Sequence, residues 1–336
     1  MYLPKEPLRR FMDVFDALNA ERGWFSDALS LKFTSMAAIT CPGDPKGIAT
    51  AIRAIADELK ERSGWFGELT GSLRFIVAAM LLQNDDRPAD FMVEVDRVRD
   101  LFRNARLRRG GSYEVMAVLV LRASGKAPIN APEVERFKAI YKEMRKHHWW
   151  ITGVADFPAC AILVGQKGSP EAIGEDIEAI YQELHSVGFK KGDPLQTAAN
   201  LLYLAKETPN VIASRYYALA DAFRRESTRI WQTEYDELAI LSFLTEPAAN
   251  IVEQVLQNQQ AIRQMRPKPA RSLAFNLASS VTFVELIQRH EKVEGITDAK
   301  AMMDMQAIIN AQQAAVMAAT TAAVVASSSA SSASSG

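Results

Sequence analysis

Cysteine is scarce in this sequence, with only 2 in 336 residues. Cys41 and Cys160 stand far apart and in no metal-ligand spacing, a usage that indicates a reducing compartment rather than a disulfide framework. The opening residues contain no apolar signal core, and no apolar run reaches the roughly 18 residues that cross a bilayer. We therefore expect a cytoplasmic protein without membrane contact.

An excess of charge of one sign is also lacking. The 39 Lys and Arg residues nearly balance the 40 Asp and Glu residues, so the formal net charge is −1. Such a balance gives no global attraction to nucleic acid or to an anionic membrane, and any attraction has to be local. With 48% hydrophobic and 24% charged residues, the composition is that of a globular chain and excludes disorder throughout.

Motifs of the common enzyme classes are missing as well. The sequence has no glycine-rich phosphate loop, His-Glu-x-x-His, Cys-x-x-Cys or Gly-x-Ser-x-Gly motif. The adjacent His147 and His148 would point about 100° apart on a helix, so we expect them to end a helix rather than share an ion. Cys160 lies in an apolar segment and is expected to be a buried, inert thiol. The sequence thus predicts no cofactor and no metal site.

What is present is a recurrence of prolines about every 40 residues. Each one opens an amphipathic stretch, and proline suits the first turn of a helix because its missing N–H would be unpaired there. The six prolines, spaced by 38 to 44 residues, are Pro45, Pro88, Pro132, Pro170, Pro209 and Pro247. The pattern predicts a series of helices that begin at these residues.

A second, more apolar set of segments lies between these stretches. Each begins with a large apolar residue, such as Tyr113 or Phe157, and carries a small residue four positions later. This spacing puts both on one helix face, where a small residue lets a neighbouring helix approach closely. The small residues are Val77, Ala117, Ala161, Ala199 and Ala239. Alternation typical of strands is scarce, so no sheet is expected.

Together the two sets predict an all-α fold of tandem α-hairpin repeats of about 40 residues. Because such hairpins cannot each bury their own apolar face, they stack into a solenoid or close into an α/α array. We expect an opening helix near 7–22, six helix pairs over about 27–265 and a seventh apolar helix at about 269–290.

The repeat domain is expected to occupy residues 1–295. A Met/Ala-rich C-terminal helix over 296–326 is expected to pack on the last repeat or on a partner, because it lacks the basic face of an interfacial membrane helix. Residues 327–336 consist of Ser, Ala and Gly and are expected to be disordered.

Some of these segments also resemble a known family. They are Gly64-Trp65-Phe66, Asp156-Phe157-Pro158-Ala159, the block from Ile180 to Gly192, and the Gln/Ala/Met-rich tail after Ala307. Together they resemble an uncharacterised bacterial family, domain of unknown function 4003, over most of the chain. The resemblance implies a single helical domain of bacterial type and brings no activity with it.

Acidic residues recur near the starts of the apolar helices: Glu68, Glu114, Asp156, Asp193 and Asp236. Acids there accept unpaired N–H groups and complement the positive end of the helix dipole, and Asp193 directly before Pro194 is typical of such a cap. The alternative is catalytic. A closed ring would gather these carboxylates around one mouth, where pairs of them could act as general acid and base.

Basic residues form a matching series at the ends of the proline-led helices, and the strongest members are Arg103, Arg106, Arg108, Arg109, Lys190 and Lys191. Cations at these ends offset the negative end of the helix dipole. Alternatively, they align along one edge beside Trp24, Trp65, Trp149 and Trp231 and bind an anionic partner such as RNA or an acidic peptide. We also expect the aromatic residues in these turns to fill the gaps between consecutive hairpins.

These observations favour a non-catalytic binding or scaffold protein with an unknown protein or peptide partner, and with an anionic partner along the basic edge as the one specific hypothesis. The alternative is an α/α-toroid enzyme that uses the carboxylates at the N-termini of its inner helices. Closure of the helix pairs into a ring is the arrangement that the enzyme requires.

Overall fold

The computed structural model describes residues 2–20, 28–63, 69, 71–125 and 128–287, which contain 14 α-helices and no β-strand. The predicted all-α fold is therefore confirmed. Within these residues no helix is long and apolar enough to span a bilayer. The predicted C-terminal helix over 296–326 and the Ser/Ala tail over 327–336 lie outside the described residues, as do Trp24, Trp65 and Glu68.

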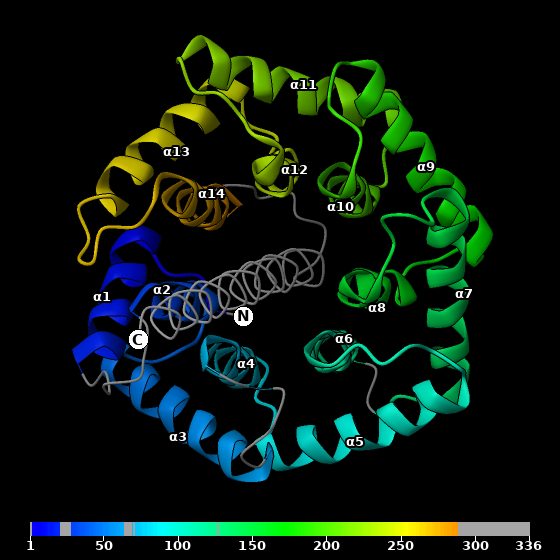
Figure 1. The fold of residues 1–336 in the computed structure, drawn as a ribbon. Helices are drawn as coiled ribbons and strands as arrows, with labels where there is room; N and C mark the ends of the chain where they lie inside the picture. The colour runs from blue at the N-terminus through cyan, green and yellow to red at the C-terminus, as the bar shows by residue number, and fades with distance from the viewer. Residues whose placement is uncertain (1, 21–27, 64–68, 70, 126–127, 288–336) are drawn as a thin grey trace, which may run out of the picture.

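The helices alternate between an outer and an inner layer of a ring (Figure 1). The outer helices are α1 (Pro7–Ala20), α3 (Pro45–Ser63), α5 (Pro88–Asn104), α7 (Ala131–His147), α9 (Pro170–Ser186), α11 (Pro209–Arg225) and α13 (Ala248–Ile262). The inner helices are α2 (Ala28–Ala37), α4 (Gly71–Gln83), α6 (Ser112–Ala123), α8 (Phe157–Val164), α10 (Asp193–Leu202), α12 (Tyr235–Leu241) and α14 (Arg271–Ile287).

The recurring prolines mark the starts of the outer helices, as predicted. Four of them are the first residue of α3, α5, α9 or α11, Pro132 is the second residue of α7, and Pro247 precedes α13. Side chains complete some of these starts. The Asn130 side chain accepts the N–H of Glu133 at 3.0 Å, and Ser169 Oγ accepts the N–H of Ala172 at 3.2 Å. Each such cap satisfies one N–H that has no partner inside its helix.

The ends of the helical chain meet. The last inner helix, α14, packs against both α1 and α2, and each other inner helix packs against its neighbours in the ring. Figure 1 shows α1 and α2 beside α13 and α14. Seven outer helices therefore surround seven inner helices without a gap between the first and the last pair.

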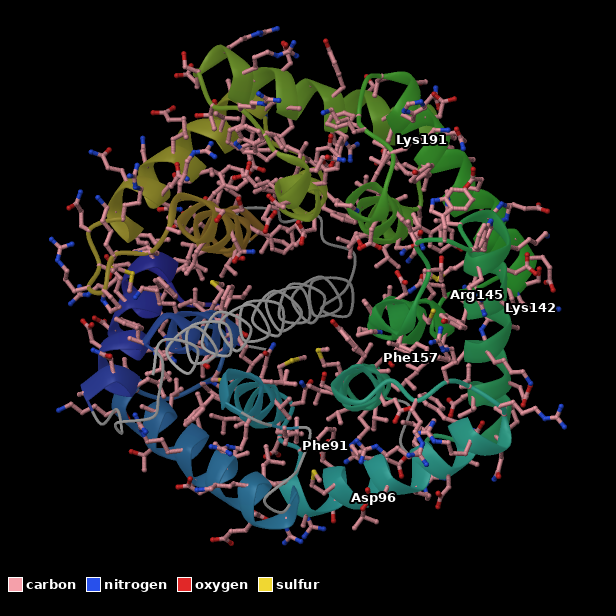
Figure 2. All side chains as sticks on the ribbon, in the orientation of Figure 1. Phe91, Asp96, Lys142, Arg145, Phe157 and Lys191 are labelled. Atoms are coloured by element: carbon pink, nitrogen blue, oxygen red, sulfur yellow. The ribbon has the colours of Figure 1, made fainter. Side chains whose placement is uncertain are left out.

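The hydrophobic core lies between the two layers. Figure 2 shows Phe91 and Phe157 there, with Lys142 on the outer side of the ring. The ring of Phe157 contacts the rings of Phe137 and Tyr141 edge-on, with centroids 5.3 Å apart in each pair. The predicted small residues are all buried: Val77, Ala117, Ala161, Ala199 and Ala239. Their size permits the close helix packing that the sequence pattern indicates.

Candidate functional site

Five described loops connect an outer helix to the inner helix that follows it. They comprise residues 105–111, 148–156, 187–192, 226–234 and 263–270. Contacts join four of these loops to the start of the next inner helix but one along the ring: Gly110 with Phe157, Thr152 with Gln196, Lys190 with Tyr235, and Glu234 with Arg271. Because each loop touches the element beside the next loop, the five lie side by side along one edge of the ring.

Gly110 is necessary for the first of these contacts. A Cβ atom at this position would lie 3.1 Å from the ring of Phe157 and 3.0 Å from Cγ of Glu114, so a side chain would force one of them to move. The third contact is a hydrogen bond in which the N–H of Lys190 donates to the Tyr235 hydroxyl at 3.2 Å. Backbone contacts of this kind hold the loops in register with one another.

Basic side chains dominate this edge, which we call the basic rim. It contains three acids, Asp156, Glu226 and Glu234, of which only Glu226 is exposed. The nine cations in its loops are Arg106, Arg108, Arg109, Lys190, Lys191, Arg229, Arg263, Arg266 and Lys268. The rim therefore carries a local positive charge that the net charge of −1 conceals.

The opposite edge has the reverse balance. It consists of the loops that lead from an inner helix to the next outer helix. Its described residues include three cations, Arg87, Lys167 and Lys206, against five acids, Asp44, Asp85, Asp86, Glu207 and Glu246. The two faces of the ring thus differ in charge.

Cations at the ends of the outer helices are paired within the protein. Lys146 Nζ lies 3.0 Å from a carboxylate oxygen of Glu143, and both Arg224 and Arg225 bind Asp221. These pairs connect residues three or four positions apart on one helix, where they contribute a few tenths of a kcal/mol each. The helix-end cations thus fit the dipole and ion-pair role.

Arg103 belongs with this paired group rather than with the rim surface. One terminal nitrogen of its guanidinium donates to both carboxylate oxygens of Glu114, at 2.8 and 2.9 Å. Glu114 is buried, lies 3.4 Å from Arg99, and also accepts the N–H of Gly110 at 2.8 Å. The charge of Arg103 is thus used inside the protein, and Glu114 anchors the loop that precedes α6.

The remaining predicted cations are available to a partner. Arg106, Arg108, Arg109, Lys190 and Lys191 are all exposed. Among the described residues, the side chains of these five form no hydrogen bond and no ion pair. A cation without an internal partner can bind an external anion without breaking an existing interaction.

The turn after α5 holds an arginine in a backbone conformation that favours glycine. Arg106 has a φ of 61°, and the N–H groups of Arg106 and Leu107 both donate to carbonyls in the last turn of α5 at 2.9 Å. Equivalent turns follow α9 at Gly188, as predicted, and α11 at Ser227. The left-handed conformation costs a residue with a side chain about 1–2 kcal/mol.

Two tryptophans project from the loop after α7. Trp149 and Trp150 are 69% and 63% exposed, and their rings meet edge-on with centroids 5.9 Å apart. The preceding His148 is buried, with its ring 4.3 Å from that of Tyr181 and its Nε2 2.7 Å from a carboxylate oxygen of Glu178. Burial lowers the pKa of His148 despite this carboxylate. His148 thus anchors the loop while the two indoles face solvent.

Trp231 occupies the corresponding loop after α11. It is 48% exposed, and the guanidinium of Arg229 lies 4.2 Å from its ring centroid. The prediction that the aromatic residues fill gaps between hairpins holds for Phe189, which is buried against Tyr216 and Tyr235. It is wrong for the three described tryptophans of the rim, because their loops are anchored by other buried side chains.

The predicted acidic series is divided among different roles. Asp156 accepts the N–H of Gly153 at 2.8 Å, and burial raises its pKa to about 7. The next turn of this type uses Glu234, which accepts the N–H of Trp231 at 2.9 Å, rather than Asp236. The predicted cap by Asp193 is wrong, since Gly192 is the N-cap of α10 and no side chain caps it.

The two thiols are buried and unreactive in character. Burial raises the pKa of Cys41 to about 12 and raises that of Cys160 as well. Cys160 lies inside α8 with its sulfur 3.3 Å from that of Met144, which confirms its predicted burial. In the part of the chain that the structure describes, no three His, Cys, Asp or Glu residues are grouped to hold a metal ion.

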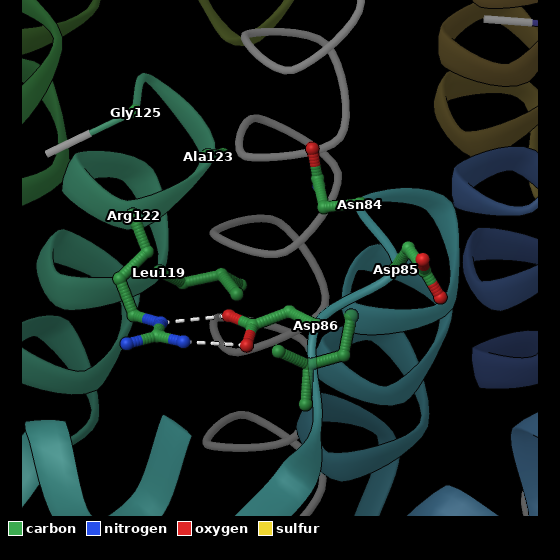
Figure 3. A pocket seen from close by; sticks show the side chains of 8 residues that line it. Asn84, Asp85, Asp86, Leu119, Arg122, Ala123 and Gly125 are labelled. Atoms are coloured by element: carbon green, nitrogen blue, oxygen red, sulfur yellow. Dashed lines mark hydrogen bonds and ion pairs between the residues drawn. The ribbon is translucent and has the colours of Figure 1, made fainter. Parts of the chain in front are cut away.

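A cavity of about 280 Å³ lies at the opposite edge, between the C-terminal ends of α4 and α6 (Figure 3). Its lining includes Asn84, Asp85, Asp86, Leu119 and Arg122. The guanidinium of Arg122 faces the carboxylate of Asp86 and donates to it through Nε at 2.7 Å. Because this pair neutralises the cation of the cavity, the cavity offers no unpaired charge to a ligand.

A second cavity, of about 340 Å³, lies beside the basic rim at the end of α13. Its lining consists of Leu256, Gln259, Gln260, Arg263, Gln264 and Lys268. Two cations and three amide groups supply hydrogen-bond donors here. Its chemistry therefore matches that of the adjoining rim.

Comparisons with known proteins identify relatives without an assigned activity. A family model described as "Protein of unknown function (DUF4003)" matches residues 14–314. The "Uncharacterized protein YeaA" of Bacillus subtilis (strain 168) is 26% identical over 267 residues, which cover 78% of each chain. No solved structure matches the sequence significantly.

Proposed function

Because the chain belongs to the DUF4003 family of proteins of unknown function, we propose a function from its own geometry: a non-catalytic binding protein of the cytoplasm whose basic rim contacts an anionic macromolecular partner. The observation that carries this proposal is the contrast between the two edges of the ring. Nine cations stand on one edge with one exposed acid, and the acids outnumber the cations on the other. A separation of charge onto two faces orients an approaching polyanion.

The state of the rim cations supports the same proposal. Helix-end cations such as Lys146 and Arg224 have carboxylate partners, whereas Arg106, Arg108 and Arg109 have none among the described residues. A purely structural role in the helix dipole does not require three arginines in one loop beyond the helix end, since the effect falls off within the last turn.

We further propose that the ring is a closed α/α array of tandem hairpin repeats of about 40 residues. Support comes from features that recur at equivalent places. Outer helices begin at the spaced prolines, small residues pack on inner helices, and left-handed turns follow α5, α9 and α11. In such an array each repeat presents its outer-to-inner loop on the same edge, so loop cations from successive repeats accumulate into one surface.

Retention on immobilised heparin tests the proposed rim. The variant R106Q/R108Q/R109Q removes three rim charges and keeps Arg103, which anchors Glu114. A matched control, R9Q/R87Q/K167Q, removes three exposed charges elsewhere. We expect the wild type and the control to elute at similar salt concentrations and the rim variant to elute earlier. Equal, weak retention of all three at about 0.1 M salt would contradict the proposal.

One observation favours the enzyme as a second candidate. The ring closes, and Asp156 has a pKa of about 7 with Asp193 nearby, which suits a general acid or base at neutral pH. Against this, the Asp156 side chain is buried and holds the N–H of Gly153. Hydrolysis of a panel of chromogenic glycosides that D156N abolishes would support the enzyme, and its absence in wild type would count against it.

A further inference from the structure

Exposed aromatic rings accompany the cations of the basic rim. Trp149 and Trp150 are the most exposed of the large apolar side chains in the described chain, apart from Val93, and Trp231 is half exposed. Indole rings normally contribute their large apolar surface to a core or an interface. Here the buried His148 and the backbone bonds from Ile151 and Thr152 to its carbonyl hold the loop, and the indoles are left to solvent.

The rim therefore combines two kinds of group in one surface. Unpaired cations attract phosphates, and flat aromatic faces stack on bases, with a guanidinium beside a ring adding a cation–π contribution. Arg229 over the ring of Trp231 shows this pairing within the protein. A single-stranded polynucleotide offers both complementary groups at every residue.

Other polyanions use only half of this surface. An acidic peptide neutralises the cations but has no base faces to cover the indoles. A nucleic-acid duplex keeps its base faces stacked inside the helix and presents mainly phosphates. We infer that the partner of the basic rim is a single-stranded polynucleotide, with Trp149, Trp150 and Trp231 as its stacking surfaces. This inference rests on the proposed function and names the partner of the same surface.

The conformation of Arg106 is an independent observation in its favour. Gly188 takes the equivalent position after α9 without strain, whereas Arg106 adopts a φ of 61° after α5. Strained residues of this kind concentrate at sites where their side chain is used. Arg106 is exposed and, within the described residues, forms no ion pair, so its side chain brings no internal contact that offsets the strain.

Fluorescence anisotropy of a labelled oligouridylate of about 20 nucleotides tests the inference at about 0.1 M salt. An oligothymidylate and a duplex of equal length, a poly-glutamate peptide and anionic phospholipid vesicles serve as competitors. The first variant is W149L/W150L, and its matched control is Y217L, which changes an exposed aromatic side chain on the outer helix α11. Circular dichroism melting checks that each variant folds.

We expect W149L/W150L to weaken oligouridylate binding by about tenfold or more, because each stacked base contributes strongly, and to leave the salt dependence unchanged. R106Q/R108Q/R109Q should instead lower the slope of log affinity against log salt by about 2, at about 0.7 for each phosphate released from a single strand. R106G should weaken binding without lowering the melting temperature, because glycine relieves the strained turn. Y217L should bind as the wild type does.

The outcomes separate the inference from the proposed function. Preference for either single strand over the duplex, the peptide and the vesicles, lost in W149L/W150L, supports both. Binding of the peptide or the vesicles at least as tightly as of the single strands, with no loss in W149L/W150L, overturns the inference and leaves an anionic partner for the rim. Failure to bind any of these polyanions overturns both.

Discussion

Replacing Glu114 by glutamine is the sharpest test of the structural role assigned to the rim carboxylates. Glu114 is 1% exposed and lies among three donors, the guanidinium groups of Arg99 and Arg103 and the N–H of Gly110. E114Q keeps the shape of the side chain and one acceptor oxygen. It removes the negative charge and turns the other acceptor into a donor that faces a cation.

The size of the effect follows from how deeply each partner is buried. Removing one member of a fully buried ion pair costs about 3–5 kcal/mol, because the other charge is left without compensation. The side chains of Arg99 and Arg103 are 26% and 31% exposed, so water solvates part of the charge that E114Q leaves behind. We therefore expect a loss of about 2–3 kcal/mol, equivalent to about 4–10 °C in melting temperature for a domain of this size.

Thermal melting followed by circular dichroism measures this loss. The control is E135Q, which changes a mostly exposed carboxylate paired with Lys138 on the surface of α7 and should shift the melting temperature by about 1 °C or less. An E114Q protein that melts together with the wild type would show that the ion pair does not hold the loop. A catalytic role for Glu114 would then have to be reconsidered.

Two further predictions concern the inner helices. Burial raises the pKa of Asp156 from its ordinary value of 3.8 to about 7, so the folded protein binds this proton more tightly than the unfolded chain, and the resulting stability is present below about pH 4 and lost as the pH rises to about 7. The melting temperature of D156N relative to the wild type should therefore rise between about pH 4 and pH 7 in a fluorimetric scan, and a constant difference would contradict the raised pKa. Ala199 is fully buried on α10, so A199L should lower the free energy of unfolding by about 1–3 kcal/mol through overpacking, whereas A54L on the exposed face of α3 should not; equal urea midpoints would refute the packing register.

Much of the fold is predictable from the sequence because its signals are local. Pro88 and Pro170 start helices through the fixed φ and missing N–H of proline, and Ala161 and Ala199 are buried because a close helix contact admits only a small residue. The closure of the ring is not predictable in this way. It depends on the sum of small rotations between successive helix pairs, to which no single residue is decisive.

The candidate site is less predictable because its important contacts join residues from different elements. The sequence groups Arg103 with the cations of the following loop, but the loop folds back and brings it onto Glu114. The short 3-10 turn before α12 likewise moves the capping role from Asp236 to Glu234. The exposure of Trp149 follows from the burial of His148 against Tyr181 and Glu178, two residues on the next outer helix.

Lysine reactivity in the presence of a polyanion tests the central claim, that the basic rim is the binding surface, most directly. The rim contains Lys190, Lys191 and Lys268, whereas Lys46 and Lys167 are exposed elsewhere and serve as internal controls in the same sample. The protein would be acetylated at limiting reagent with and without heparin, and each lysine quantified by mass spectrometry. We predict that the three rim lysines lose reactivity when heparin is added and that Lys46 and Lys167 do not. Protection of Lys167 equal to that of Lys190 and Lys191, or no protection of the rim lysines, would contradict the claim.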